Sequence, residues 1–299
     1  MKAILKPSTI ALFKKHGWRV DRAIHNYLYF VFYYPYVFIL YHTFKFLTDH
    51  FSWFTPLRHF LKFAFDRYHA KILSFGDTRK ILELNRDIAH TSDSNRSIIP
   101  YKFAYKIIFT EPDFIAVMDC PCKKTMGDEE WAIHSCIAIG KPVASFWLEH
   151  GKKYNAERIT QHQALELIKN FRKHGYITQA FFKVATGGST GVICNCHPKS
   201  CVSLKATQFA KKFDDSLSMN AAAGYSVVHD ETKCKHCGDC SRICPFNAIS
   251  VSNTSWMYNK NDCAGCELCV EHCTHNALSM DIDKSKPRPL DIAALPLKY

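Results

Sequence analysis

A duplicated cysteine pattern constrains this chain more than any other feature of its sequence. Four cysteines in the first copy recur 29 residues later as four in the second: Cys234, Cys237, Cys240 and Cys244, then Cys263, Cys266, Cys269 and Cys273. The segment Asn-Ala-Ile-Ser at 247–250 also recurs, as Asn-Ala-Leu-Ser at 276–279. Duplication of one small supersecondary unit explains both matches.

Each copy has the spacing Cys-x2-Cys-x2-Cys-x3-Cys. A short loop wrapped around a cubane cluster brings three thiolates to three irons, so the fourth ligand must come from elsewhere in the chain. Zinc sites also use Cys-x2-Cys pairs, but zinc gives no reason for a third Cys-x2 step in register twice. We therefore expect iron-sulfur chemistry in residues 225–283.

This duplicated motif resembles that of the bacterial-type 2(4Fe-4S) dicluster ferredoxin family over about sixty residues. The resemblance implies two 4Fe-4S clusters whose fourth ligands are exchanged between the halves. One cluster would be held by Cys234, Cys237, Cys240 and Cys273, and the other by Cys263, Cys266, Cys269 and Cys244. One departure is that Pro245 follows the last cysteine of the first half, whereas Thr274 stands at the equivalent place in the second.

Six further cysteines lie upstream, in a Cys-Pro-Cys segment, a Cys-Asn-Cys segment and two single positions: Cys120, Cys122, Cys136, Cys194, Cys196 and Cys201. Two Cys-x-Cys loops at strand ends can converge and supply four thiolates to a soft metal site. A third iron-sulfur cluster is our first interpretation. Structural zinc, and unmetallated or disulfide-forming thiols, stay open as alternatives. The whole layout, about residues 113–283, resembles a broader group of 4Fe-4S electron-transfer proteins, which implies association with larger redox enzymes.

The predicted fold class is α+β, with a mixed α/β middle domain at residues 77–224. We expect a helix at 77–90, a strand at 113–118 that leads to Cys120, and a helix that begins with a capping box at Thr160 and Gln163 and stops at Gly175. A strand at 176–184 should lead through the Gly187-Gly188 turn into a cysteine-rich loop at Cys194. The C-terminal tail is residues 284–299.

The N-terminal part, residues 1–76, should be a hydrophobic, aromatic-rich helical segment. Residues 23–44 contain no Asp, Glu, Lys or Arg, and 27–41 are apolar or aromatic throughout. Six tyrosines and Pro35 argue against a true span, while residues 51–68 alternate aromatic and basic side chains at helical spacing. We expect contact with a membrane or a membrane subunit through residues 23–69, by monotopic attachment. The alternative is a helix buried against the chain's own core or a partner.

The distribution of charge and the number of cysteines limit the choice of cellular compartment and of binding partners. The formal charge is +13 on residues 1–224, −4 on 225–283 and +3 on the tail. Nucleic acid, anionic lipid and an acidic protein all suit a basic region, but nucleic acid is not the expected partner. Disulfide scaffolds belong to short secreted chains, and residues 1–26 are not expected to act as a secretion signal, because they carry six bases and no small-residue cleavage site after an early apolar run. We expect reduced thiols and a location at the cytoplasmic face of the membrane.

The sequence thus predicts an iron-sulfur electron-transfer subunit of a larger, membrane-associated, anaerobic-type redox complex, with other redox subunits as partners. The alternative is a redox enzyme whose catalytic iron-sulfur site is formed by the six upstream cysteines. Four polar residues near these cysteines could move protons, namely His134, Glu149, His150 and His197, but a surface or supporting role is the better interpretation. No catalytic residue is therefore assigned.

Overall fold

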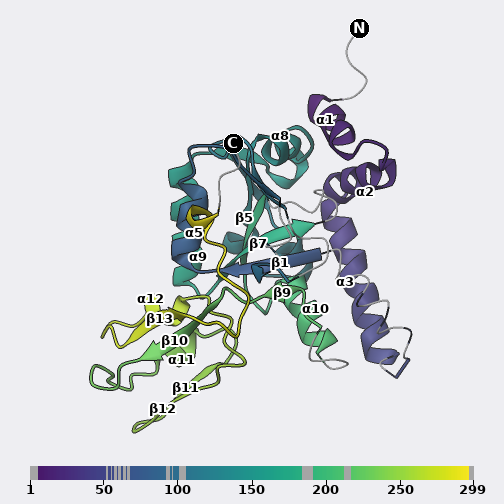
Figure 1. The fold of residues 1–299 in the computed structure, drawn as a ribbon. Helices are drawn as coiled ribbons and strands as arrows, with labels where there is room; N and C mark the ends of the chain where they lie inside the picture. The colour runs from purple at the N-terminus through teal and green to yellow at the C-terminus, as the bar shows by residue number, and fades with distance from the viewer. Residues whose placement is uncertain are drawn as a thin grey trace.

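The computed structural model describes residues 6–51, 68–91, 97–100, 106–183, 191–211 and 217–295, with single positions at 53, 54, 56, 59, 62, 65 and 95. Figure 1 shows three parts: N-terminal helices along one side, a central sheet between helices, and the cysteine repeat at the opposite lower end. The Gly187-Gly188 turn and most of residues 52–67 lie outside the described residues.

A seven-stranded sheet forms the centre of the molecule. Its strands follow in the order β6 (Glu157–Ile159), β4 (Ile115–Asp119), β5 (His134–Ile139), β8 (Val192–Cys196), β7 (Ile177–Lys183), β1 (Tyr68–Leu73) and β9 (Asn220–Ala221). All neighbours pair antiparallel except β1 and β9, which are parallel. Strand β1 precedes the boundary expected at residue 77, so the sheet extends across that boundary.

Helices cover both faces of this sheet, which explains why its central strands are apolar on both sides. In β4, Ile115 and Val117 point to one core, while Ala116 and Met118 point to the other. The first core lies under α5 (Phe75–Leu82) and α9 (Gln161–Lys173). The second lies under α8 (Lys141–His150), α10 (Val202–Ala210) and the N-terminal helices.

Several predicted elements of the middle part are confirmed. Helix α9 begins with the expected capping box, in which Thr160 Oγ1 accepts from the Gln163 backbone N–H and the Gln163 side chain binds the Thr160 backbone. Gly175 follows its end with φ +82°, a conformation that favours glycine. The predicted strands before Cys120 and after Gly175 are β4 and β7.

Two predictions for the middle part were wrong. The helix expected over 77–90 ends at Leu82, and residues 88–91 instead form β2 (Ile88–Thr91), which pairs with β3 (Lys106–Phe109). The supposed loop at Cys194 is strand β8. Strands β2 and β8 form by pairing with other segments of the chain, and local periodicity does not report such pairing.

The N-terminal part forms α1 (Pro7–His16), α2 (Val20–Val31) and α3 (Tyr33–His50) rather than one hydrophobic helical segment. Pro35 explains the break at Phe32. In a continuous helix its ring would clash with the carbonyl of residue 31, and it has no N–H to donate to that carbonyl. Pro35 is tolerated in the first turn of α3. Among the described residues, no helix combines the length and apolarity needed to cross a bilayer, so an apolar N-terminal span is not supported.

These helices use their aromatic side chains to cover the second core. Tyr29, Tyr33, Val37 and Tyr41 recur about every four residues and are buried. The last three therefore lie on one face of α3, toward the sheet. The expectation of a helix buried against the chain's own core is met on this face.

The cysteine repeat folds as two similar halves. Its elements are β10 (Tyr225–His229), α11 (Asp239–Ile243), β11 (Ile249–Val251), β12 (Trp256–Tyr258), α12 (Leu268–Glu271) and β13 (Leu278–Ile282). β10 pairs antiparallel with β13, and β11 with β12. The tail then returns to the first core, where Leu290, Ile292 and Leu295 are buried.

Buried Lys71 fastens this tail to β1. Its ammonium donates to the carbonyls of Ala222, Pro287 and Arg288 at 2.5, 3.2 and 2.8 Å. One fully buried side chain thereby joins the sheet, the segment before β10 and the tail.

Candidate iron-sulfur centres

The backbone conformation of the cysteine repeat recurs with the same 29-residue offset as its sequence. Three positions of the first half have positive φ, and so do their three equivalents in the second: 236, 238 and 247, then 265, 267 and 276. These conformations bend each loop back on itself so that its first three cysteines face one cavity. A Cβ at Gly265 would lie 2.5 Å from the Tyr225 carbonyl oxygen, which explains glycine at that position.

Backbone amides donate to sulfur at equivalent places in the two halves. The N–H groups of His236 and Gly265 each lie 3.4 Å from the sulfur of the cysteine two residues earlier. The N–H groups of Ala248 and Ala277 each lie 3.3 Å from the sulfur of the cysteine four residues earlier. Such donors stabilise thiolate charge and are a principal means by which proteins tune iron-sulfur potentials.

The eight thiols surround two separate cavities, and each cavity draws its cysteines from both halves. One is lined by Cys234, Cys237, Cys240 and Cys273; the other is lined by Cys244, Cys263, Cys266 and Cys269. Each has a volume of about 20 Å³. This is the crossed grouping that the ferredoxin resemblance implied, so the structure brings together each predicted set of four.

Polar contacts dock the second of these cavities against the central sheet. Arg172 of α9, which is 1% exposed, donates to the Cys266 carbonyl at 2.5 Å and to Thr178 Oγ1 at 3.3 Å. Its Nε also donates to both carboxylate oxygens of Glu271, at 2.9 and 3.0 Å. Glu267, at φ +73°, accepts from the Phe75 backbone N–H at the start of α5. The repeat is therefore held rigidly against the middle of the chain.

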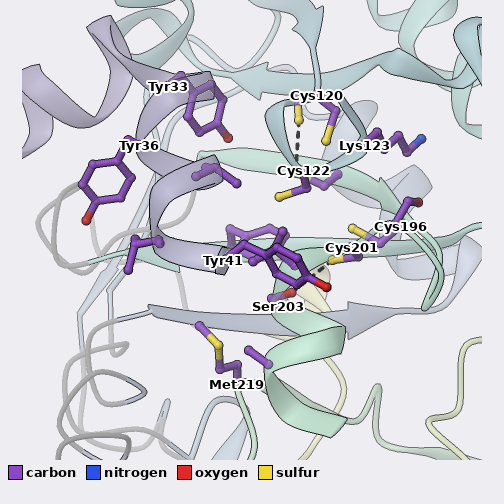
Figure 2. Close-up of a pocket in the computed structure, with 18 of the residues that line it drawn as sticks. Tyr33, Tyr36, Tyr41, Cys120, Cys122, Lys123, Cys196, Cys201, Ser203 and Met219 are labelled. Atoms are coloured by element: carbon purple, nitrogen blue, oxygen red, sulfur yellow. Dashed lines mark hydrogen bonds between the residues drawn. The ribbon is translucent and has the colours of Figure 1, made fainter. Parts of the chain in front are cut away.

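The six upstream cysteines also converge on one place. Cys120 follows β4 and caps α6 (Pro121–Met126), which carries Cys122, and α7 (Glu130–Ile133) leads into β5 with Cys136. Cys136 lies opposite Cys194 in the β5–β8 pair, and their sulfurs are 3.7 Å apart. All six thiols line a single cavity of about 290 Å³. Figure 2 shows Cys120, Cys122, Cys196 and Cys201 around this space.

The tyrosines of α2 and α3 close this cavity on the side away from the sheet. Tyr29, Tyr33 and Tyr41 are each less than 10% exposed and line the space together with the thiols. In Figure 2, the Tyr33 hydroxyl is directed toward the sulfur atoms. We name the space between α3, β8 and α10 the six-cysteine cavity. The sequence allowed for a helix buried against the chain's own core, but it gave no sign that these tyrosines cover the upstream cysteines.

The electrostatics of the six-cysteine cavity keep the six thiols from ionising together until a cation is supplied. Hydrogen bonding to Cys122 lowers the pKa of Cys120, and hydrogen bonding to Cys196 lowers that of Cys201. The other four thiols have raised pKa values. Hydrogen bonding to Cys120 and Cys194, followed by burial, raises the pKa of Cys136 well above the ordinary thiol value. Hydrogen bonding to Cys120, followed by burial, does the same to Cys122. So many crowded, buried sulfurs cannot all ionise unless positive charge lies between them. Iron in a cluster provides that charge, and its binding would release protons. The donor set therefore fits an iron-sulfur group.

The thiols of the two ferredoxin-like cavities were also compared with what an iron-sulfur cluster requires, namely buried cysteines that ionise only when a metal binds. Burial raises the pKa of Cys266 to about 12, so this thiol also needs a metal to become a thiolate ligand. Within the described ranges, no three His, Cys, Asp or Glu side chains converge closely enough to hold a single metal ion.

A buried positive charge stands beside the six-cysteine cavity. The aliphatic part of Lys123 lines it, while Nζ donates to the Ala132 carbonyl and lies 3.9 and 4.3 Å from the ring centres of Phe171 and Tyr176. Lys123 is 1% exposed. A fixed cation at this place favours an anionic thiolate-bound group, and no sequence motif pointed to it.

The four polar residues considered as proton carriers are occupied elsewhere. His134 lies 2.9 Å from Asp119 Oδ1, Glu149 accepts from the Ser8 backbone, and His150 contacts Thr9 Oγ1 at 2.9 Å. The ring of His197 packs on Tyr176. None of the four lines the six-cysteine cavity, so their placement agrees with a supporting role.

Comparison with known proteins identifies one part of the chain. Residues 233–277 match the family described as a 4Fe-4S dicluster domain. Among curated proteins, none matches the chain at a significant level. The match agrees with the duplicated motif and with the two four-cysteine cavities. The C-terminal part of this chain is therefore a ferredoxin-type 4Fe-4S dicluster domain.

Proposed function

We propose that this protein is an iron-sulfur electron-transfer subunit of a larger redox complex. A 4Fe-4S dicluster domain implies iron-sulfur electron transfer. The observation that carries the proposal is the presence of three thiol-lined cavities in one rigidly packed chain. Clusters bound there supply reversible one-electron chemistry, and the chain's own residues set their position, hydrogen bonding and exclusion from water.

Ligand assignments follow the thiol groupings. In the dicluster domain, we assign Cys234, Cys237, Cys240 and Cys273 to one 4Fe-4S cluster and Cys263, Cys266, Cys269 and Cys244 to the other. A third iron-sulfur centre would draw its ligands from Cys120, Cys122, Cys136, Cys194, Cys196 and Cys201. The excess of thiols over the four that a cubane cluster needs leaves the choice among the six to experiment.

The packing between the two regions supports a continuous path. Arg172 contacts both the Cys266 carbonyl and Thr178, and Ile177, the neighbour of Thr178, lies opposite Cys196 in the β7–β8 pair. A short chain of hydrogen bonds and covalent bonds thus joins the dicluster domain to the six-cysteine cavity.

The outer face of the N-terminal helices supports a membrane or membrane-subunit contact at the cytoplasmic face. Large apolar side chains are exposed on α2, on α3 and at the break between them, namely Ile24, Leu28, Phe32, Phe38, Ile39 and Phe46. Basic residues flank them, including Arg19, Arg22 and Lys45. An apolar strip with basic borders suits an anionic lipid surface.

Spectroscopy of the reduced protein tests the electron-transfer role. Full-length protein is isolated without oxygen, titrated with a low-potential reductant and followed by electron paramagnetic resonance. We expect signals from the dicluster domain, together with a third that is lost in Cys194→Ser/Cys196→Ser but kept in Cys234→Ser. A spectrum unchanged by the upstream double substitution would refute the third centre and leave the dicluster domain intact.

Membrane attachment has a separate test. Deletion of residues 1–69 would also uncover the six-cysteine cavity, so substitution of Phe38, Ile39 and Phe46 by Gln is the sharper variant. We expect the wild type to sediment with anionic vesicles and the triple variant to stay in the supernatant. Equal sedimentation of both would refute the contact.

A second candidate function is that of a redox enzyme that acts at the upstream centre. The observation in its favour is the size of the six-cysteine cavity. Its volume of about 290 Å³ exceeds that of either ferredoxin-like cavity more than tenfold. A signal of the third centre that shifts when a substrate is added would support catalysis.

A further inference from the structure

The six-cysteine cavity has room for more than a cluster. The ferredoxin-like cavities, whose cysteine spacing suits one cubane each, have volumes of about 20 Å³. The six-cysteine cavity has about 290 Å³, close to the lower limit for small-molecule sites in proteins. The lining includes residues of α3 and α10 as well as the thiols, so the cavity extends between these two helices.

The walls of this additional space are aromatic and aliphatic. On α3 they are formed by Val37, Tyr41 and Phe44, and on the opposite side by Ala206 and Met219. Such a lining selects a flat, apolar ligand, because aromatic side chains gain most from contact with another ring system. A strongly charged ligand would lose its hydration there without compensation.

A polar anchor is present in the lining of the same cavity. Ser200 is 2% exposed and lines the cavity, and its hydroxyl has no hydrogen-bond partner among the described atoms. A buried hydroxyl without a partner costs free energy, so its place in a cavity points to a ligand that accepts a hydrogen bond there. Ser203, by contrast, is already engaged with Cys201 at 3.2 Å.

The cavity reaches the protein surface along α3. Leu40 both lines the cavity and is 45% exposed, and its neighbour Ile39 is 64% exposed on the apolar outer face. A ligand with a long apolar tail can therefore hold its head group in the cavity while its tail passes Leu40 to that outer face.

We propose that the six-cysteine cavity binds a quinone that carries an apolar side chain. Its ring would lie against the aromatic residues of α3, one carbonyl oxygen would accept from the Ser200 hydroxyl, and the tail would leave beside Leu40. A quinone combines the required features, namely a flat ring, strong acceptors and no net charge. The inference rests on the proposed function only in placing a redox centre at the same thiols, and binding itself can be measured without that centre.

The test measures binding of a 1,4-naphthoquinone with one prenyl unit to full-length protein, by quenching of intrinsic fluorescence and by equilibrium dialysis. Val37→Trp fills the cavity from its α3 wall, whereas Thr43→Trp adds the same side chain at an exposed position of the same helix that does not line the cavity. We expect saturable one-to-one binding by the wild type and by Thr43→Trp, and at least tenfold weaker binding by Val37→Trp. Equal affinity in the two Trp variants would overturn the proposal.

A smaller change guards against misfolding of the Trp variant. Ser200→Ala removes only the hydroxyl and should weaken quinone binding three- to tenfold, while a naphthalene of the same size without carbonyls should bind both proteins equally. An unchanged quinone affinity in Ser200→Ala would contradict the proposed orientation. The signals of the dicluster domain, recorded for each variant, verify the fold.

Iron analysis of the same samples separates this inference from the proposed function. Quinone binding with an upstream centre that lacks iron would leave the ligand site standing and refute the third cluster. A full complement of iron without any quinone binding would refute the ligand site and leave electron transfer standing.

Discussion

The ion pair between Arg172 and Glu271 offers a direct test of how the chain tunes one cluster. Arg172 is almost fully buried, whereas the Glu271 side chain is 27% exposed. The guanidinium lies 2.5 Å from the carbonyl oxygen of Cys266, a proposed ligand of one cluster only. It contacts a proposed ligand of that cluster directly, and the other cluster provides an internal reference.

The expected effect follows from Coulomb's law. The hydrogen bond plus the span of one cysteine places the guanidinium about 7 Å from the Cys266 sulfur, where a unit charge at an effective dielectric constant of about 20 contributes about 2.4 kcal/mol. For a one-electron couple, this energy corresponds to roughly 100 mV. Arg172→Gln should therefore lower the potential of this cluster by about 100 mV. Glu271→Gln should raise it by less, because water partly screens that carboxylate.

The assay is an anaerobic potentiometric titration of the full-length protein, followed by electron paramagnetic resonance. Arg172→Lys keeps the charge and is the matched control, so its potential should stay within about 30 mV of the wild-type value. The more distant cluster should shift by less than half as much as the nearer one in every variant. Shifts of the same sign in Arg172→Gln and Glu271→Gln, or equal shifts of both clusters, would refute this reasoning.

Three further predictions concern ligands and stability. Cys273→Ser should abolish the same spectroscopic signal as Cys234→Ser, and loss of different signals would refute the crossed ligand sets. Lys71→Met leaves three buried carbonyls without their donor and should lower the free energy of unfolding by about 1–3 kcal/mol, measured by denaturant titration. Burial, opposed by Asp77, lowers the pKa of Lys71 from 10.5 to about 7, so the unfolded chain binds more protons between these values. Wild-type stability should consequently rise with pH in that window relative to Lys71→Met, and a constant difference would contradict the assigned shift. Thr160→Ala removes the capping box of α9 and should cost about 1 kcal/mol in the same assay, whereas no loss would show that tertiary contacts alone hold the start of the helix.

Local signals were sufficient for the parts of the fold that local chemistry determines. The 29-residue repeat in the sequence reappears in the backbone conformations at 236 and 265 and in the N–H to sulfur contacts. The capping box at Thr160 and the stop at Gly175 were likewise predictable, because both depend on side chains and φ values within a few residues of one another.

The sequence suggested that the upstream cysteines converge, but not the strand pairing that brings them together. Cys136 and Cys194 are 58 residues apart and meet only because β5 pairs with β8. Arg172 lies in no motif, yet it contacts the Cys266 loop from a helix almost a hundred residues away. The aromatic run of α3 was ambiguous because a tyrosine-rich face gains equally from a membrane interface or from a protein core. The structure places one face on the core and leaves the other exposed.

Iron and acid-labile sulfide content of protein isolated without oxygen shows whether these thiols hold redox-active iron. We predict about twelve irons and about twelve sulfides per chain, which fall to about eight of each in Cys194→Ser/Cys196→Ser. A colourless protein that contains zinc, or no metal, at these fourteen cysteines would contradict iron-sulfur binding.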